Sequence, residues 1–190
     1  MTRHSPLIRA EQAGDEPAIR RVQQAAFPTP AESQLVDDLR AAGRLTISLV
    51  AIVDGEIVGH IAFSPVTIET AAIETATIDA NSSASATAPT GLGLAPLAVM
   101  PDWQRHGIGT ALGHAGMSEC RRLGVPYVVV LGSPIYYARF GFAAAARWNL
   151  LDEYQGGPAF QAIELIAGVI PAEGGLVRYA PEFAIFAPDA

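Results

Sequence analysis

The segment from Leu97 to Leu112, which reads LAVMPDWQRHGIGTAL, places the strongest constraint on how this chain can fold. Its apolar start predicts the end of a strand, and a helix is expected from about Gly107 to Leu123. A helix N-terminus leaves its first N–H groups unpaired and carries partial positive charge, so it attracts phosphate. Gly107 and Gly109 let the backbone approach an anion without an intervening Cβ. The segment predicts an anion-binding turn, although the same glycines would also serve a purely structural turn.

A dinucleotide-binding site is the main alternative for glycines placed between a strand and a helix. Its Gly-x-Gly-x-x-Gly fingerprint needs a third glycine three residues after Gly109, where Leu112 stands, and the next glycine is Gly113. No acidic residue in a following strand offers itself as a ribose ligand. The dinucleotide interpretation therefore fails at two points.

The basic residues exclude other kinds of phosphate and covalent chemistry. All twelve are arginine, and the chain has no lysine. A Walker P-loop, a pyridoxal Schiff base and a lysine nucleophile are therefore ruled out. The net charge of −7 argues against nucleic-acid binding, which depends on clustered positive charge. The same acidity is weakly consistent with a cationic small-molecule substrate.

Cysteine and histidine content limits disulfide and metal chemistry. Cys120 is the single cysteine, which excludes an internal disulfide and a zinc site made of four thiolates. The four histidines are His4, His60, His106 and His114, and no two are spaced to share one helix face as metal ligands. We therefore expect no metal site.

Composition predicts one folded domain covering residues 1–190. Half of the chain is hydrophobic and 16% is charged, as in globular proteins. The first ten residues lack the apolar core of a signal peptide. No apolar run approaches the 18 residues of a membrane span. We therefore expect a cytoplasmic protein that binds neither a membrane nor nucleic acid.

Hydrophobic periodicity and turn residues predict an alternation of helices and strands typical of a mixed α/β domain. Between the elements, Glu69–Thr90 is rich in Ala, Ser and Thr, and we expect an exposed, mobile insertion. Pro96 interrupts an apolar strand and predicts a bulge there, which would leave backbone groups unpaired. The expected strands are 6–10, 47–53, 56–63 with an extension through 68, 92–99, 127–131, 160–166 and 176–179, and the expected helices are 15–27, 31–42, 107–123 and 135–140.

Two motifs resemble those of the GCN5-related N-acetyltransferase (GNAT) family. Gln104-Arg105-His106-Gly107-Ile108-Gly109 matches the pyrophosphate loop Gln/Arg-x-x-Gly-x-Gly/Ala and follows Leu-Ala-Val-x-Pro, as in the family. Residues 128–142, VVVLGSPIYYARFGF, resemble the family's fifth strand and short fourth helix, which ends in Tyr-x-x-x-Gly-Phe. The run LGSPIYYARFGF is most like the YhbS-type branch. The resemblance extends from about Ile8 to about Tyr179.

The resemblance implies a mixed, mostly antiparallel, twisted sheet, splayed between its fourth and fifth strands, with helices on both faces. It implies transfer of the acetyl group of acetyl-CoA to an amine, on a small molecule or a peptide. Acetyl-CoA would then lie along the splayed strand and the pyrophosphate loop. The residues implied in its binding are Leu97, Ala98, Val99, Gln104, Arg105, His106, Gly107, Ile108, Gly109, Thr110 and Ser133.

The resemblance also assigns Tyr137 as the group that serves the departing CoA thiolate. Two departures from the family's pattern stand beside this assignment. Val130 occupies a position where many relatives carry asparagine, and no acidic residue lies between positions 91 and 99, where a general base often sits. The base is therefore unassigned, with a water chain, His60 and Glu32 as candidates.

Two other functions stay open at this point. A non-catalytic acyl-CoA sensor on the same fold would explain the absence of an obvious base. An anion-binding structural module would explain the glycines without any enzyme activity. Neither the acceptor amine nor the oligomeric state follows from the sequence, although edge strands near the C-terminus are compatible with a homodimer.

Overall fold

The structure, a computed structural model, describes residues 5–70 and 89–187. The insertion predicted at Glu69–Thr90 lies mainly outside the described residues, because only its first two and last two positions fall within these ranges. Glu69 itself is the last residue of a long strand.

A mixed sheet forms the centre of the molecule, with strand order β1-β2-β3-β4-β5-β8-β6. All pairs along this path are antiparallel except the parallel pair β4–β5. The Asp54-Gly55 turn between β2 and β3 has positive φ at both residues, as a tight two-residue hairpin requires. The strands are β1 (Leu7–Ala10), β2 (Ile47–Val53), β3 (Glu56–Glu69), β4 (Gly91–Val99), β5 (Tyr127–Leu131), β6 (Ala143–Ala144), β7 (Leu150–Asp152), β8 (Phe160–Glu164) and β9 (Gly175–Arg178).

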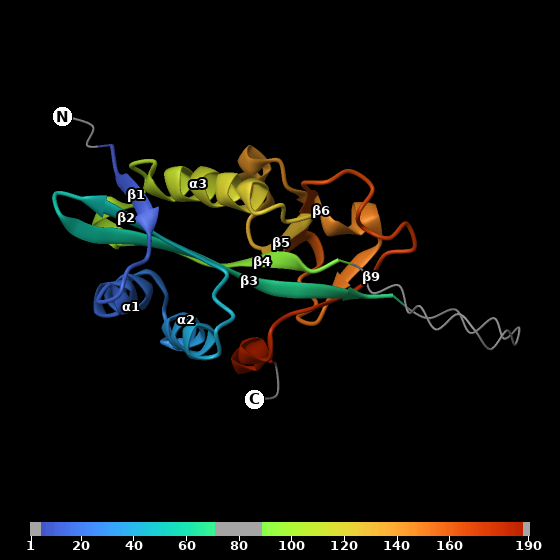
Figure 1. Ribbon diagram of the computed structural model, residues 1–190, viewed down its shortest axis with the longest axis horizontal. Coiled ribbons are helices and arrows are strands. Elements are labelled where there is room, and N and C mark those ends of the chain that lie inside the picture. The colour runs from blue at the N-terminus through green and yellow to red at the C-terminus, as the bar shows by residue number, and fades with distance from the viewer. Residues whose placement is uncertain (1–4, 71–88, 188–190) are drawn as a thin grey trace, which may run out of the picture.

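Helices cover both faces of this sheet, as predicted (Figure 1). Helices α1 (Glu16–Ala26) and α2 (Ala31–Ala41) lie on one face, and α3 (Ile108–Arg122) lies on the other. Helix α4 (Pro134–Tyr137) is a single turn that continues as a 3₁₀ turn over Ala138–Phe140. Within the described ranges, no helix combines the length and the apolar character that crossing a bilayer requires.

The sheet splays between β4 and β5, which confirms the expected distortion. The two strands pair only through Leu92 with Val128 and Gly93 with Val129. On the other side of β4, the register with β3 shifts, because Leu94 lies opposite Phe63 but Leu97 lies opposite Ile61. Two residues of β4, Ala95 and Pro96, therefore stand opposite one residue of β3, Ala62. The bulge predicted at Pro96 is therefore present.

The far end of β3 carries a second, smaller group of strands. Its residues Thr67–Glu69 pair with β9, which pairs in parallel with β7. The chain after β9 forms a 3₁₀ helix over Pro181–Phe186, which Figure 1 shows beside α2. Arg44, just after α2, donates from Nε to Glu182 at 2.9 Å. The C-terminal segment, residues 179–187, therefore packs against α2.

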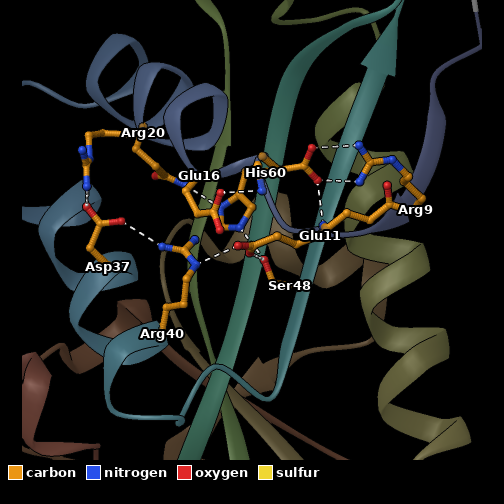
Figure 2. Close-up of polar contacts among 12 residues, drawn as sticks. Arg9, Glu11, Glu16, Arg20, Asp37, Arg40, Ser48 and His60 are labelled. Carbon is orange, nitrogen blue, oxygen red and sulfur yellow. Dashed lines mark hydrogen bonds and ion pairs between the residues drawn. The ribbon is translucent and has the colours of Figure 1, made fainter.

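A polar chain, buried at Gln23 and His60 and partly buried elsewhere, fixes α1 and α2 to the sheet (Figure 2). The Gln23 amide nitrogen donates to His60 Nδ1 at 2.7 Å, so the imidazole proton lies on Nε2. The Nε2–H group donates to Ser48 Oγ at 2.9 Å. Ser48 in turn donates to the Glu11 carboxylate. Arg40 closes the chain, because its Nε donates to Glu11 at 2.7 Å. Residues from α1, α2, β2 and β3 are thus joined.

His60 is held neutral at the centre of this chain. Its side chain is fully buried. Burial, together with the positive charge of Arg40, lowers the pKa of His60 from 6.5 to about 3. Protonation would also convert Nδ1 from an acceptor into a donor, so that it would face the amide donor of Gln23.

We expect His60 to make the stability of the fold depend on pH. Below about pH 6.5, His60 takes up a proton in the unfolded chain. In the folded chain the His60 side chain stays neutral down to about pH 3. The free energy of unfolding should therefore fall as the pH drops through this window, by about 1 kcal/mol per pH unit from this group. Urea unfolding at pH 7 and pH 5 measures the loss.

His60→Gln is the matched variant, because its amide keeps polar atoms in the site but does not titrate. Its stability should fall less between pH 7 and pH 5 than that of the unchanged chain, since the carboxylates that titrate there are common to both proteins. Equal losses in the two proteins would show that His60 is not the buried, neutral group described above.

Candidate active site

Two cavities meet where β4 and β5 diverge. The first, of about 600 Å³, lies between the start of α3 and α4. The second, of about 390 Å³, lies between β4, α2 and the C-terminal segment. Leu97 and Tyr137 line both cavities. The first is lined by Leu97, Val99, Gln104, Arg105, Gly107, Gly109, Thr110, Tyr136, Tyr137 and Arg139.

The start of α3 faces the first cavity with a backbone suited to an anion. Gly107 precedes the helix in the left-handed region at φ 85°, and apart from its neighbours along the chain no atom lies within 4 Å of the position that its Cβ would occupy. Ala111 N–H donates to the Gly107 carbonyl at 2.9 Å. The N–H groups of Ile108, Gly109 and Thr110 come before this bond, so helix geometry gives them no carbonyl within the helix. They carry the positive end of the helix dipole.

The charges lining the first cavity are all positive. Arg105 and Arg139 contribute guanidinium groups, and the described lining residues include no aspartate or glutamate. Arg139 donates to Thr110 Oγ1 at 3.0 Å and to the Tyr136 carbonyl at 2.7 Å, and its guanidinium lies 4.3 Å from the centre of the Tyr136 ring. The cavity therefore favours an anion although the chain as a whole is acidic.

Tyr136 and Arg139 are site residues that the sequence reasoning did not identify. A Cβ on Gly109 would lie 2.7 Å from the Tyr136 hydroxyl, so this glycine lets α4 pack closely against α3. One sequence feature could have pointed to these two residues. Tyr136 and Arg139 are three positions apart, so they lie on one side of a helical turn. Their contact with Thr110 depends on the tertiary structure.

Seven of the predicted cofactor residues line the first cavity, and the side chains of the other four do not. Leu97, Val99, Gln104, Arg105, Gly107, Gly109 and Thr110 line the first cavity. Ala98 and Ile108 are buried. His106 is exposed, with Nδ1 2.8 Å from the Gln104 carbonyl oxygen. Ser133 is exposed just before α4, where its carbonyl accepts the N–H groups of Tyr136 and Tyr137, each at 3.0 Å.

Tyr137 stands at the junction of the two cavities. Its ring packs edge-on against Tyr136 and Phe142, with ring centres 5.1 and 5.8 Å apart. Burial raises the pKa of Tyr137 to about 12, and the neighbouring Tyr136 adds to the shift. A Cβ on Gly132 would lie 2.4 Å from this ring, so the glycine before α4 makes room for it. Tyr137 is therefore a protonated phenol held in one position.

The two side-chain candidates for a general base occupy very different places. Glu32, in the first turn of α2, lines the second cavity. His60 lines neither cavity, and both of its ring nitrogens are engaged in the polar chain. A histidine with a pKa of about 3 also has little capacity to accept a proton at neutral pH. The structure therefore gives His60 a structural role. Val130, in the asparagine position, is buried in the core.

Residues 16–142 match the model of the acetyltransferase (GNAT) family. The chain is 35% identical over 179 residues to the uncharacterized N-acetyltransferase YhbS of Escherichia coli strain K12, covering 93% of this chain and 98% of that protein. It is 33% identical over 148 residues to the uncharacterized N-acetyltransferase YjhQ of the same strain, covering 77% of this chain and 74% of YjhQ.

Two solved structures are similar over nearly the whole chain. YhbS from Escherichia coli in complex with CoA has a TM-score of 0.79 at 34% identity, covering 94% of this chain and 91% of that one. A GNAT family acetyltransferase from Brucella melitensis in complex with acetyl-CoA has a TM-score of 0.71 at 35% identity, covering 95% of this chain and 99% of that one. With the splayed sheet and the glycine turn into α3, these matches show that the chain belongs to the GNAT acetyltransferase family.

Proposed function

We propose that this protein transfers the acetyl group of acetyl-CoA to a primary amine. The observation that carries the proposal is that a cavity suited to an anion and a second cavity share Tyr137 and Leu97 at the opening between β4 and β5. Two substrates bound in these cavities would meet beside Tyr137. Similar proteins hold CoA or acetyl-CoA in their structures, which supports acetyl-CoA as one of the two.

The hydrogen-bond donors of the first cavity match the anionic groups of acetyl-CoA. The N–H groups at the start of α3 would hold the pyrophosphate, with Arg105 and Arg139 neutralising its charge. The backbone of Leu97–Val99 lies beyond the last paired residue of β4 and β5, so its groups on that side would bind the pantetheine amides. Acetyl-CoA supplies an acyl thioester, whose carbonyl carbon the amine attacks.

Tyr137 would act on the sulfur as the thioester breaks. The amine nitrogen forms the new C–N bond, and the electron pair of the C–S bond goes to sulfur. Because the pKa of Tyr137 is raised to about 12, its hydroxyl is protonated at neutral pH and donates its proton to that sulfur. The proton lost by the amine nitrogen returns through solvent to the phenolate. An amine that arrives as an ammonium ion first gives one proton to solvent.

We predict that Gly109→Val weakens acetyl-CoA binding at least tenfold, which corresponds to about 1.4 kcal/mol. The new side chain would enter the cavity and collide with the Tyr136 hydroxyl, which lies 2.7 Å from the Cβ position. Titration calorimetry with acetyl-CoA measures the change. Ser118→Val, at an exposed position of the same helix, is the control and should bind normally. Unchanged affinity in folded Gly109→Val would exclude this loop as the cofactor site.

We predict that Tyr137→Phe lowers turnover roughly 10²-fold, the range of a positioned acid, with little change in acetyl-CoA affinity or melting temperature. The substitution keeps the ring and removes only the proton donor. Tyr127→Phe is the matched control, because Tyr127 is fully buried and lines neither cavity. Release of the CoA thiol reports the rate.

Two results would contradict these assignments. Normal turnover by Tyr137→Phe would make the tyrosine a packing residue. Binding of acetyl-CoA by the unchanged chain, without CoA release on any amine, would replace the enzyme by an acyl-CoA sensor.

A further inference from the structure

The lining of the second cavity is mainly apolar and contains one carboxylate among its described residues. We propose that the acceptor is a small primary amine carried on an apolar body of about the size of a benzene ring, such as an arylalkylamine. This inference rests on the acetyl transfer proposed above and names its substrate class. The amine group would lie toward Tyr137 and Glu32, and the ring would lie against the aromatic side chains of the C-terminal segment.

The apolar wall is a continuous row of aromatic rings. Tyr154 and Tyr179 have ring centres 5.4 Å apart, Tyr179 and Phe183 are 5.2 Å apart, and Phe183 and Phe186 are 6.4 Å apart. All four line the second cavity. Offset and edge-on contacts at these distances are the preferred geometry of aromatic groups, so a ligand ring can extend the row.

This wall is held in place before any ligand binds. The Tyr154 hydroxyl donates to the Phe183 carbonyl at 2.9 Å, which ties the segment after β7 to the C-terminal 3₁₀ helix. Phe183 packs in one cluster with Leu35 and Leu39 of α2. Burial raises the pKa of both Tyr154 and Tyr179, so their rings stay neutral. A preformed site spends little of its binding energy on ordering side chains.

One carboxylate faces this apolar space. Glu32 is the single charged side chain among the described lining residues. It is half-buried at the start of α2, where Thr29 Oγ1 lies 3.3 Å from its Oε2. A carboxylate beside neutral aromatic rings favours an ammonium group, through charge and through the negative faces of the rings. The ligand should therefore combine one cation with an apolar body.

Size and polarity argue against a peptide as the occupant. The cavity volume of about 390 Å³ lies in the lower range of small-molecule sites. A peptide segment would bring amide N–H and C=O groups, and each would need a partner once buried. Apart from Glu32, the side chains of the lining offer only the hydroxyls of Tyr137, Tyr154 and Tyr179, and that of Tyr154 is already engaged. An amine without amides fits this lining better.

The test measures binding and turnover separately. Calorimetry on the CoA-saturated protein compares 2-phenylethylamine, ethanolamine and a hexapeptide with a free N-terminal alanine, and CoA-thiol release compares the same amines. We expect 2-phenylethylamine to bind at least tenfold more tightly than the other two and to give the highest kcat/KM. Equal or better binding of ethanolamine or the peptide would overturn the proposal.

Two variants with matched controls test the residues. Phe183→Leu keeps an apolar side chain in the core cluster and should weaken 2-phenylethylamine binding at least fivefold, whereas Ile185→Ala, on the same 3₁₀ helix but outside the lining, should not. Glu32→Gln should weaken 2-phenylethylamine at least tenfold and leave neutral 2-phenylethanol unchanged. Asp38→Asn removes the same charge from α2 outside the cavity and should change neither.

The two readouts separate this inference from the proposed transfer. Binding of 2-phenylethylamine that depends on Phe183 and Glu32, without CoA release, would support the cavity assignment and overturn the transfer. CoA release on ethanolamine or the peptide, unaffected by Phe183→Leu, would support the transfer and overturn the substrate class.

Discussion

The geometry of the site depends on the fact that β4 and β5 pair through only two residue pairs before they separate. A fully paired parallel ladder would engage the inner backbone groups of both strands and leave no opening between them. Pro96 has no N–H to offer a ladder, and the bulge at Ala95-Pro96 shifts β4 relative to β3 at the same level. Beyond this point Leu97 on β4 and Tyr137 after β5 border both cavities. The position of the two cavities thus follows from where the strands part.

The two cavities carry side-chain charges of opposite sign, positive in the first and negative in the second. The chain carries a net charge of −7, yet the described residues that line the first cavity include two arginines and no carboxylate, together with the positive end of α3. The second cavity has one carboxylate and no cationic side chain among its described lining residues. Local charge, rather than net charge, decides which ligand each cavity favours. This arrangement suits an anionic cofactor and a cationic acceptor that approach one point from two sides.

Sequence reasoning identified the features that are encoded locally and missed those that depend on packing. The glycine turn into α3 and the bulge at Pro96 follow from the conformational needs of single residues, so both were predictable. Arg139 reaches Thr110, 29 positions away, only because α4 lies against α3. His60 was a reasonable candidate base from its residue type, but its burial against α1 and its contacts with Gln23 and Ser48 are tertiary facts.

The length of β3 separates the elements that line the two cavities. The first part of this strand pairs with β2 and β4, and its last three residues pair with β9. The strand thereby carries the segment that supplies most of the aromatic wall of the second cavity, while the described residues that line the first cavity all lie between positions 97 and 139. Of the residues that the structure describes, Leu97 and Tyr137 alone belong to both linings. Changes in the aromatic row can therefore reshape the second cavity without disturbing the anion-binding turn, whereas Tyr137 borders both cavities.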